Sequence, residues 1–257
     1  MMHGMHWLAV GEHTIPDGTD WLSPREAARA AGMRFTKRRT EYRLRRLAGK
    51  RAVAAALGRP TDAAGLASIQ LLNRPGGAPY VVVDGAEVPM DVSLTDRAGW
   101  AVCLVGAHGE FVSGTLGVDL EIVEPRSPGF VSDYFTPPEQ AYVAAEGGVS
   151  HVDGQAAANL IWSAKEAALK VLRVGLRADT RVVEVTVGEQ VRPDGWAPLL
   201  IDVVTGERFP GWWRRDGRYL LTLATRHTLA PPTTLTGGDD LTTAVPVHSW
   251  LAKPLAD

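Results

Sequence analysis

The stretch from Trp162 to Lys170, WSAKEAALK, lies well inside residues 156–174, a segment whose apolar periodicity predicts a long helix. It holds two of the five lysines in a chain with 27 basic residues. A lysine carries a compact point charge of the kind that binds a phosphate. Glu166 and Lys170 are four positions apart, so an ordinary surface ion pair is the alternative. The stretch therefore indicates either an anion site or an exposed helix face.

A second acidic motif, GVDLE, runs from Gly117 to Glu121 within residues 116–123, which predict a strand. Alternation along a strand puts Asp119 and Glu121 on one face, with Val118 and Leu120 on the other. Neighbouring carboxylates repel each other unless a cation or a base neutralises them. We therefore expect a cation beside this strand, and a solvent-facing strand edge is the alternative.

Basic residues cluster between Arg34 and Arg51, where Glu41 is the one acidic residue. On a helix that begins near Thr36, spacings of four, three and four put several cations on one face, nearly opposite a row of leucines and alanines. This stripe consists of Arg39, Arg43, Arg46 and Lys50. Its alternative is a solvated basic face, but the scarcity of acidic partners favours an anion site.

The remaining segments predict a mixed fold. Apolar runs separated by turn residues predict strands, among them residues 100–105 and residues 212–225, which include a hairpin turn at Asp216-Gly217. Thr136, with Glu139 three positions later, predicts a helix start within residues 133–145. Helices and strands do not alternate regularly, and the sequence shows no short repeat, which indicates an α+β fold.

Composition excludes several classes of protein. The 257 residues are 45% hydrophobic and can bury the core of one large domain or of two smaller ones. The single cysteine, Cys103, lies in an apolar run and predicts a core residue in a reducing compartment. No stretch approaches the roughly 18 apolar residues of a membrane span. We expect a cytoplasmic protein with no membrane partner, and the net charge of -2 argues against a surface that coats nucleic acid.

Together and in this order, the motifs GVDLE and WSAKEAALK resemble the paired signature of the 4'-phosphopantetheinyl transferase superfamily. The resemblance is to the surfactin-synthetase-activating (Sfp) type, in its actinobacterial-like form, and covers roughly Arg34 to Thr225. Further similar segments are Lys37 to Arg39 with Arg46 and Lys50, Gly77 to Pro79, Ser93 to Arg97, Glu124 to Arg126, and Asp133 to Thr136.

The resemblance implies an α+β fold of two pseudo-symmetric halves with the active site in the cleft between them. The first half is expected at residues 1–112, with a cationic helix that binds coenzyme A. The second is expected at residues 113–228, with the magnesium-binding motifs, and the two would join near residues 109–117. Residues 229–257, rich in Pro, Thr, Gly and Asp, predict a poorly ordered tail. Two halves in one chain would make a monomer sufficient.

The implied activity is that of a magnesium-dependent holo-[acyl-carrier-protein] synthase. Such an enzyme transfers the 4'-phosphopantetheine arm of coenzyme A to a serine of an apo acyl or peptidyl carrier protein and releases adenosine 3',5'-bisphosphate. It thereby activates carriers of polyketide and nonribosomal peptide biosynthesis. Because the serine oxygen attacks a pyrophosphate, charge on the phosphates must be neutralised, and Mg²⁺ with oxygen ligands does this.

The family's functional residues map onto this chain position by position. Asp119, Glu121 and Glu166 match its three acidic metal ligands. Glu166 is also placed to accept the serine proton, and Lys170 to stabilise the departing phosphate, so these two are the expected catalytic residues. Arg38 and Arg46, two helical turns apart, are expected to clamp the 3'-phosphate. The full set of expected coenzyme A-binding residues is Arg38, Arg46, Lys50, Thr95, Asp96, Lys165 and Lys170.

Asp96 departs from the family pattern, which usually has histidine there. An aspartate has a reference pKa of about 3.9 and repels a phosphate at neutral pH. Either Arg97 or Arg46 neutralises it, or its side chain points away, or coenzyme A binding is weakened. The alternative function is a degenerate paralogue that binds coenzyme A or a carrier protein with little turnover. A nucleic-acid-binding module on the cationic helix is disfavoured, because few aromatic side chains accompany the cations.

Overall fold

The computed structural model describes residues 4–106, 115–174, 178–188, 191–248 and 253–254. It divides into two compact units, Met1–Leu116 with Pro232–Asp257, and Gly117–Pro231. Most of the predicted join at residues 109–117, and the boundary after residue 112, lie outside the described residues. Helices and strands mix without regular alternation, so the α+β prediction is confirmed. Within the described part of the chain, no helix is both long and apolar enough to cross a membrane.

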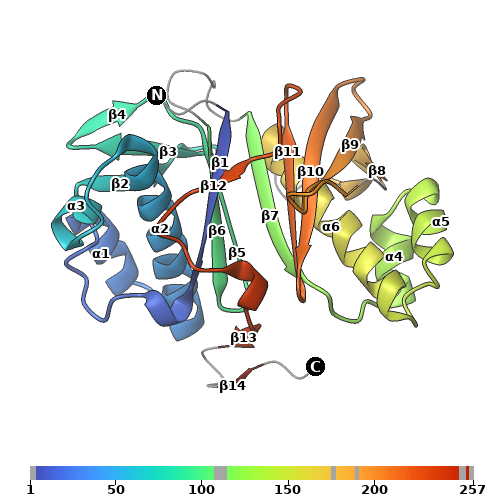
Figure 1. The fold of residues 1–257 in the computed structure, drawn as a ribbon, viewed down its shortest axis with the longest axis horizontal. Coiled ribbons are helices and arrows are strands. Elements are labelled where there is room, and N and C mark those ends of the chain that lie inside the picture. The colour runs from blue at the N-terminus through green and yellow to red at the C-terminus, as the bar shows by residue number, and fades with distance from the viewer. Residues whose placement is uncertain (1–3, 107–114, 175–177, 189–190, 249–252, 255–257) are drawn as a thin grey trace. The chain divides into compact units, whose positions relative to one another are not determined.

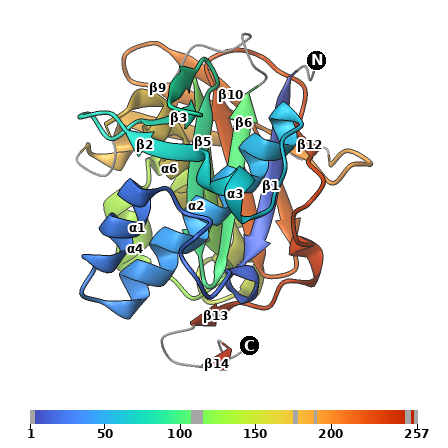
Figure 2. The same cartoon turned by 90° about the vertical axis from the view of Figure 1, so that its left-hand side faces the viewer.

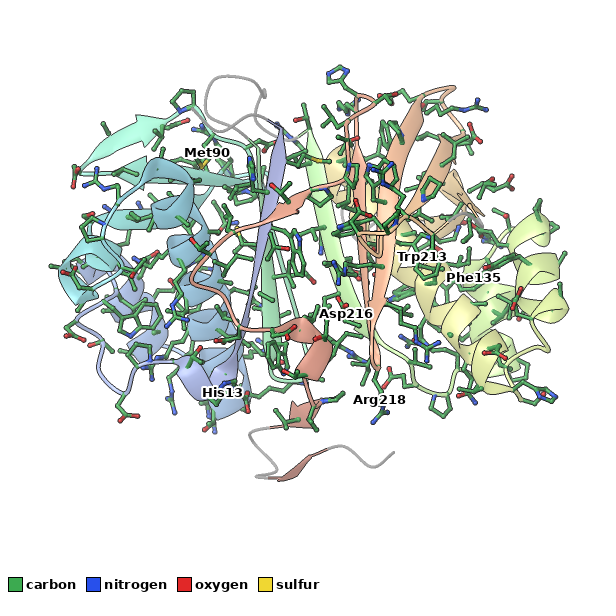
Figure 3. All side chains as sticks on the ribbon, viewed as in Figure 1. His13, Met90, Phe135, Trp213, Asp216 and Arg218 are labelled. Carbon is green, nitrogen blue, oxygen red and sulfur yellow. The ribbon has the colours of Figure 1, made fainter. Side chains whose placement is uncertain are left out.

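In the first unit, a long helix lies on one face of a sheet with the strand order β12-β1-β6-β5 (Figures 1 and 2). The helix, α2 (Thr36–Leu57), begins where the sequence predicted, and its apolar face, with Leu44 and Leu47, is buried in the core together with Met90 (Figure 3). Gly58, with φ of 63°, ends it in the left-handed region that glycine adopts without steric cost. The other elements are β1 (Met5–Gly11), η1 (Glu12–Thr14), α1 (Pro24–Ala31), α3 (Ala63–Ala67), β2 (Ile69–Asn73), β3 (Pro79–Val83), β4 (Ala86–Val88), β5 (Val92–Arg97), β6 (Trp100–Gly106), β12 (Thr233–Thr234), η4 (Leu241–Thr243), β13 (Val247–His248) and β14 (Lys253–Pro254).

In the second unit, helix α6 (Val152–Leu172) packs on a five-stranded sheet with the order β7-β11-β10-β9-β8 (Figure 1). The strands are β7 (Leu116–Ile122), β8 (Val183–Val187), β9 (Ala197–Val203), β10 (Arg208–Asp216) and β11 (Tyr219–Thr225), and a short helix, η3 (Thr180–Val182), precedes β8. The hairpin turn between β10 and β11 lies at Gly217-Arg218, one residue later than the predicted Asp216-Gly217, because Asp216 pairs with Tyr219; Asp216 and Arg218 are labelled in Figure 3. The strand and helix predictions that contain both motifs are confirmed.

The helix predicted within residues 133–145 is two helices. Thr136 begins the second one, α5 (Pro137–Ala145), through a capping box with Glu139, as predicted. Residue Asp133, however, belongs to a separate helix, α4 (Pro128–Tyr134). Phe135 between them is extended and buried, and it is labelled in Figure 3. Burial of this aromatic side chain stabilises a break that the helical pattern alone does not indicate.

A buried ion pair ties helix α2 to its surroundings in the first unit. Lys50 Nζ lies 2.7 Å from Glu26 Oε2, and both side chains are almost fully buried. Lys50 also donates to the carbonyl oxygens of Leu66 and Ile69, while the backbone N–H of Leu71 donates to Glu26 Oε1 at 3.1 Å. Helices α1, α2 and α3 and strand β2 are thus held at one point.

The second unit contains the same arrangement. Lys165 Nζ of α6 lies 2.8 Å from Glu139 Oε2 and donates to the carbonyl oxygens of Thr180 and Val183. The N–H of Val185 donates to Glu139 Oε1 at 2.8 Å. In each unit, therefore, a capping-box glutamate, a lysine of the long helix and the first residues of a strand form one buried clamp. A clamp of the same kind thus occurs in each unit, although the sequence shows no repeat.

The C-terminal segment returns to the first unit. Thr233 and Thr234 of β12 pair with β1, and Leu235 is buried in the core of this unit. Asp239 Oδ2 accepts a hydrogen bond of 2.8 Å from the N–H of Gly11. The prediction of a poorly ordered tail over residues 229–257 is therefore wrong for this part. The backbone of β1 supplies hydrogen-bond partners that the composition of the tail cannot indicate.

Candidate functional site

Strand β7 and helix α6 approach each other closely, and Gly117 makes the approach possible. A Cβ atom at position 117 would stand 2.0 Å from the carbonyl oxygen of Ala167. Only a glycine fits there, which explains why the GVDLE motif begins with one. The contact places Asp119, on the same face of β7, beside the WSAKEAALK segment of α6.

The Asp119 carboxylate, which is buried, is held on both oxygens by residues of α6. Lys170 Nζ lies 2.9 Å from Oδ1, and the Ser163 hydroxyl donates to Oδ2 at 2.9 Å. Lys170 also donates to the carbonyl oxygen of Val118 at 2.7 Å. The cation expected beside this strand is thus Lys170, which comes from the second motif.

Glu121, two residues further along β7, is also buried and has a different cation nearby. Arg126 Nη2 lies 3.5 Å from Glu121 Oε2. Arg126 is itself oriented by Asn159, whose side-chain oxygen accepts from Nε at 2.8 Å, and by the ring of Phe130, 4.7 Å from the guanidinium carbon. Arg126 Nη2 also lies 3.5 Å from Glu124 Oε1, so Glu121 shares its basic neighbour, whereas Asp119 is paired with Lys170.

Glu166 lies three positions after Ser163 and four before Lys170, so it shares the face of α6 that contacts β7. Its side chain is half-buried. The carboxylates of Asp119, Glu121 and Glu166 are the type of ligand that Mg²⁺ prefers, and the donor set therefore fits that ion. In the part of the chain that the structure describes, no three His, Cys, Asp or Glu side chains form a ready-made metal site.

Lys165, expected at a phosphate, is instead part of the buried clamp of the second unit. Its ammonium group makes three contacts, with Glu139 and two backbone carbonyls, which use all of its donors. Burial lowers the pKa of Lys165, and the neighbouring Glu139 carboxylate partly opposes this shift. The sequence assignment of Lys165 to coenzyme A is therefore corrected to a structural one.

Two of the three helix cations assigned to coenzyme A are also buried. Lys50 uses its three donors in the clamp of the first unit, and burial lowers its pKa. Arg46 has its Nε 3.7 Å from Glu26 Oε1, and its guanidinium carbon lies 4.7 Å from the centre of the Tyr42 ring. Arg38, nearer the start of α2, is exposed. A phosphate clamp by Arg38 and Arg46 together does not match this arrangement, because Arg46 is buried beside Glu26 and Tyr42 while Arg38 is exposed.

The β5 residues assigned to coenzyme A lie on opposite faces of their strand. Asp96 forms an ion pair with Arg45 of α2, a partner that none of the three sequence alternatives named. Thr95 is buried and, by alternation, points to the opposite face of the strand. Asp96 is therefore a neutralised partner of the helix, and it also contributes, after burial, to a raised pKa of Glu41.

Sequence reasoning missed several residues that shape this region. Ser163 stands inside the quoted motif, but nothing in the sequence links it to Asp119. Glu26 follows Ser23 by three positions, the pattern of a capping box, and this signal could have indicated helix α1. That Glu26 also meets Lys50 depends on how α1 packs against α2.

Comparison with known proteins gives a family-model match that covers both motifs. Residues 115–223 match the family model described as ACPS, the 4'-phosphopantetheinyl transferase superfamily. No curated protein matches the chain. Among solved structures, a holo-(acyl-carrier-protein) synthase from Bacillus anthracis str. Ames in complex with CoA (3',5'-ADP) is 23% identical, covering 40% of this chain and 92% of that chain, with a TM-score of 0.34. The segment from Thr115 to Leu223, which carries GVDLE and WSAKEAALK, is thus similar in sequence to the 4'-phosphopantetheinyl transferase superfamily.

Proposed function

We propose that this protein is an Sfp-type 4'-phosphopantetheinyl transferase, which moves the phosphopantetheine arm of coenzyme A to a serine of an apo acyl or peptidyl carrier protein. The observation that carries the proposal is the contact of Lys170 Nζ with Asp119 Oδ1, 2.9 Å, which joins the two motifs inside the segment that matches the family model. Two units built on one plan within one chain support the Sfp type. The proposal also includes that the protein is a monomer and acts in the cytoplasm.

The reaction forms a bond between the serine oxygen and the phosphorus that carries pantetheine, and it breaks the bond to adenosine 3',5'-bisphosphate. Asp119, Glu121 and Glu166 would hold Mg²⁺, which neutralises charge on the pyrophosphate. Glu166, half-buried on the α6 face that contacts β7, accepts the serine proton. Lys170, about one-third exposed, stabilises the charge on the departing phosphate.

In the first unit, the proposal assigns the 3'-phosphate to Arg38 alone. Arg38 is exposed near the start of α2, whereas Arg46 and Lys50 are buried, with Lys50 paired to Glu26. Thr95 stays a proposed nucleotide contact. Asp96 is not a repulsive charge in this scheme, because Arg45 pairs with it. The ion pair removes the reason to regard the chain as a degenerate paralogue.

The test incubates the full chain with coenzyme A, Mg²⁺ and a panel of apo carrier proteins, and mass spectrometry measures the gain of one phosphopantetheine. The Glu166→Gln variant should lose nearly all transfer at saturating coenzyme A and keep its thermal unfolding curve, since an amide is a poor metal ligand and cannot accept the proton. Glu146→Gln is the matched control, because Glu146 is exposed at the end of α5.

Three results would count against the proposal. Absence of any mass gain across the panel would overturn it. Coenzyme A binding without transfer would replace it with the degenerate paralogue. Near-normal turnover of Glu166→Gln throughout a magnesium titration would remove Glu166 from the mechanism.

A further inference from the structure

The two oxygens of Asp119 have different surroundings. Oδ1 meets the ammonium group of Lys170, a side chain that is 31% exposed. Oδ2 accepts from the hydroxyl of Ser163, which is completely buried. Oδ1 therefore lies on the side of the carboxylate nearer to solvent, and Oδ2 is turned into the protein.

The Ser163 hydroxyl is in turn held by strand β11. Its oxygen lies 2.8 Å from Thr222 Oγ1, and the Thr222 side chain is completely buried as well. An ionised carboxylate only accepts hydrogen bonds, so Ser163 donates its one proton to Asp119 and accepts from Thr222. The result is a chain of hydrogen bonds from β11 through α6 to β7, and a charged acceptor at its end polarises both hydroxyls.

Such a chain restricts how the Asp119 side chain can rotate. Turning the carboxylate would break the bond to Ser163 and leave a buried hydroxyl without its acceptor, which costs free energy. In proteins generally, partners of this kind orient metal-ligating carboxylates, and their loss weakens metal binding. The hydroxyl pair is not part of the hydrophobic core that α6 forms with its alanines, Ile161 and Val171.

We propose that Ser163 and Thr222 are positioning residues that hold Asp119 with Oδ1 presented to a divalent cation. This inference rests on the proposed function, in which Asp119 is a metal ligand. Neither hydroxyl touches the cation or the substrate. They act through the orientation of the carboxylate. A bound cation would take the place that the Lys170 ammonium group occupies at Oδ1.

The test measures Mn²⁺ binding to the full chain by calorimetry, without coenzyme A or carrier protein, together with thermal unfolding. Ser163→Ala and Thr222→Val should each weaken Mn²⁺ binding by about tenfold. Ser163→Thr, which keeps a hydroxyl, should restore most of the affinity. The matched control is Thr225→Val on the same strand, since the buried Thr225 hydroxyl donates to the backbone carbonyls of Pro210 and His227 rather than to a carboxylate.

Each outcome decides a separate point. Wild-type Mn²⁺ affinity in Ser163→Ala, with or without a lower melting temperature, would overturn the positioning role alone. If Ser163→Ala does not fold, Thr222→Val carries the test, and unchanged affinity there has the same meaning. A wild-type protein that binds no Mn²⁺ would overturn the metal role of Asp119 in the proposed function, and this inference with it.

Discussion

At the scale of single residues, burial decides what each lysine of this chain can do. Lys50 and Lys165 are fully buried and use every donor on glutamates and backbone carbonyls. Lys170 is partly exposed and reaches the Asp119 carboxylate. Lys50 and Lys165 therefore have structural roles in the two buried clamps, and Lys170 is the candidate catalytic residue among these three lysines.

Replacing Lys165 should destabilise the protein far more than replacing an exposed lysine. Lys165→Met leaves the buried Glu139 carboxylate without its cation, which costs about 3–5 kcal/mol. Lys37→Met is the control, because Lys37 is 52% exposed and lies 3.9 Å from Glu41, a contact worth at most about 1 kcal/mol. Urea unfolding of both variants measures the difference. Similar losses in the two variants would contradict the clamp.

The clamp of the first unit should also show in the pH dependence of stability. Burial lowers the pKa of Lys50 from its ordinary value of 10.5 in the folded protein. Between that lowered pKa and 10.5, the unfolded chain holds more protons than the folded one, so the free energy of unfolding contributed by Lys50 rises with pH. Between pH 7 and 10.5, the free energy of unfolding of the wild type should therefore rise relative to that of Lys50→Met. A difference in free energy of unfolding that stays constant with pH would show that Lys50 keeps its usual pKa.

Arg38 should determine how tightly the 3'-phosphate of coenzyme A binds. Arg38→Ala removes an exposed cation, and loss of one charged hydrogen bond costs about 1.5 kcal/mol, or roughly tenfold in affinity. Dephospho-coenzyme A, which lacks this phosphate, should bind both proteins equally. Arg215→Ala on β10, also exposed, serves as the control in calorimetric titrations. Equal losses for both ligands would place Arg38 elsewhere than at the 3'-phosphate.

At the scale of elements, the close contact of β7 with α6 brings the two motifs together. Gly117 allows the strand to reach the backbone of α6 at Ala167, and Asp119 then meets Ser163 and Lys170. Lys165, on the same helix, ties α6 to α5 and to the start of β8. Helix α6 is therefore held by β7 through Ser163 and Lys170, and by α5 and β8 through Lys165.

Gly117→Ala should separate β7 from α6. The new Cβ would lie 2.0 Å from a backbone carbonyl oxygen, which cannot move aside as a flexible side chain can. We expect a loss of about 1–3 kcal/mol in stability, together with a weaker contact of Asp119 with Lys170. Gly76→Ala is the control, since nothing lies within 4 Å of that Cβ position. Thermal unfolding compares them, and an unchanged Gly117→Ala protein would disprove the steric argument.

At the scale of the whole molecule, the first unit contains both the N-terminal and the C-terminal segments of the chain, and the second unit contains the residues between them. The C-terminal segment after Pro231 belongs to the first unit, where β12 pairs with β1. Asp239 accepts from the N–H of Gly11 and from the Thr14 hydroxyl. The first unit therefore needs both ends of the sequence to complete its sheet.

Removing residues 232–257 should weaken the first unit and spare the second. Hydrogen exchange measured by mass spectrometry should become faster in β1, because its pairing with β12 and the burial of Leu235 are lost. Protection in α6 and β11 should stay as in the full chain. Asp239→Ala, a milder change, should produce a smaller effect in β1. Unchanged exchange in β1 would show that the C-terminal segment does not stabilise this unit.

By itself, the sequence determined the elements and the chemistry on them. Hydrophobic periodicity and capping signals are local, so they predicted α2, α6, β7 and the β10–β11 hairpin. Two short motifs indicated the resemblance to the superfamily whose model matches residues 115–223. Sequence alternation also placed Asp119 and Glu121 on one face of β7, the face that Gly117 brings against α6.

Only the tertiary structure decided which charges are available. Glu26 meets Lys50, Glu139 meets Lys165 and Arg45 meets Asp96 through packing of elements that are distant in sequence. A spacing rule reports which helix face a lysine occupies, but not what lies against that face. Burial and partner together set the charge state and the free donors of each side chain, and both arise only when the chain has folded.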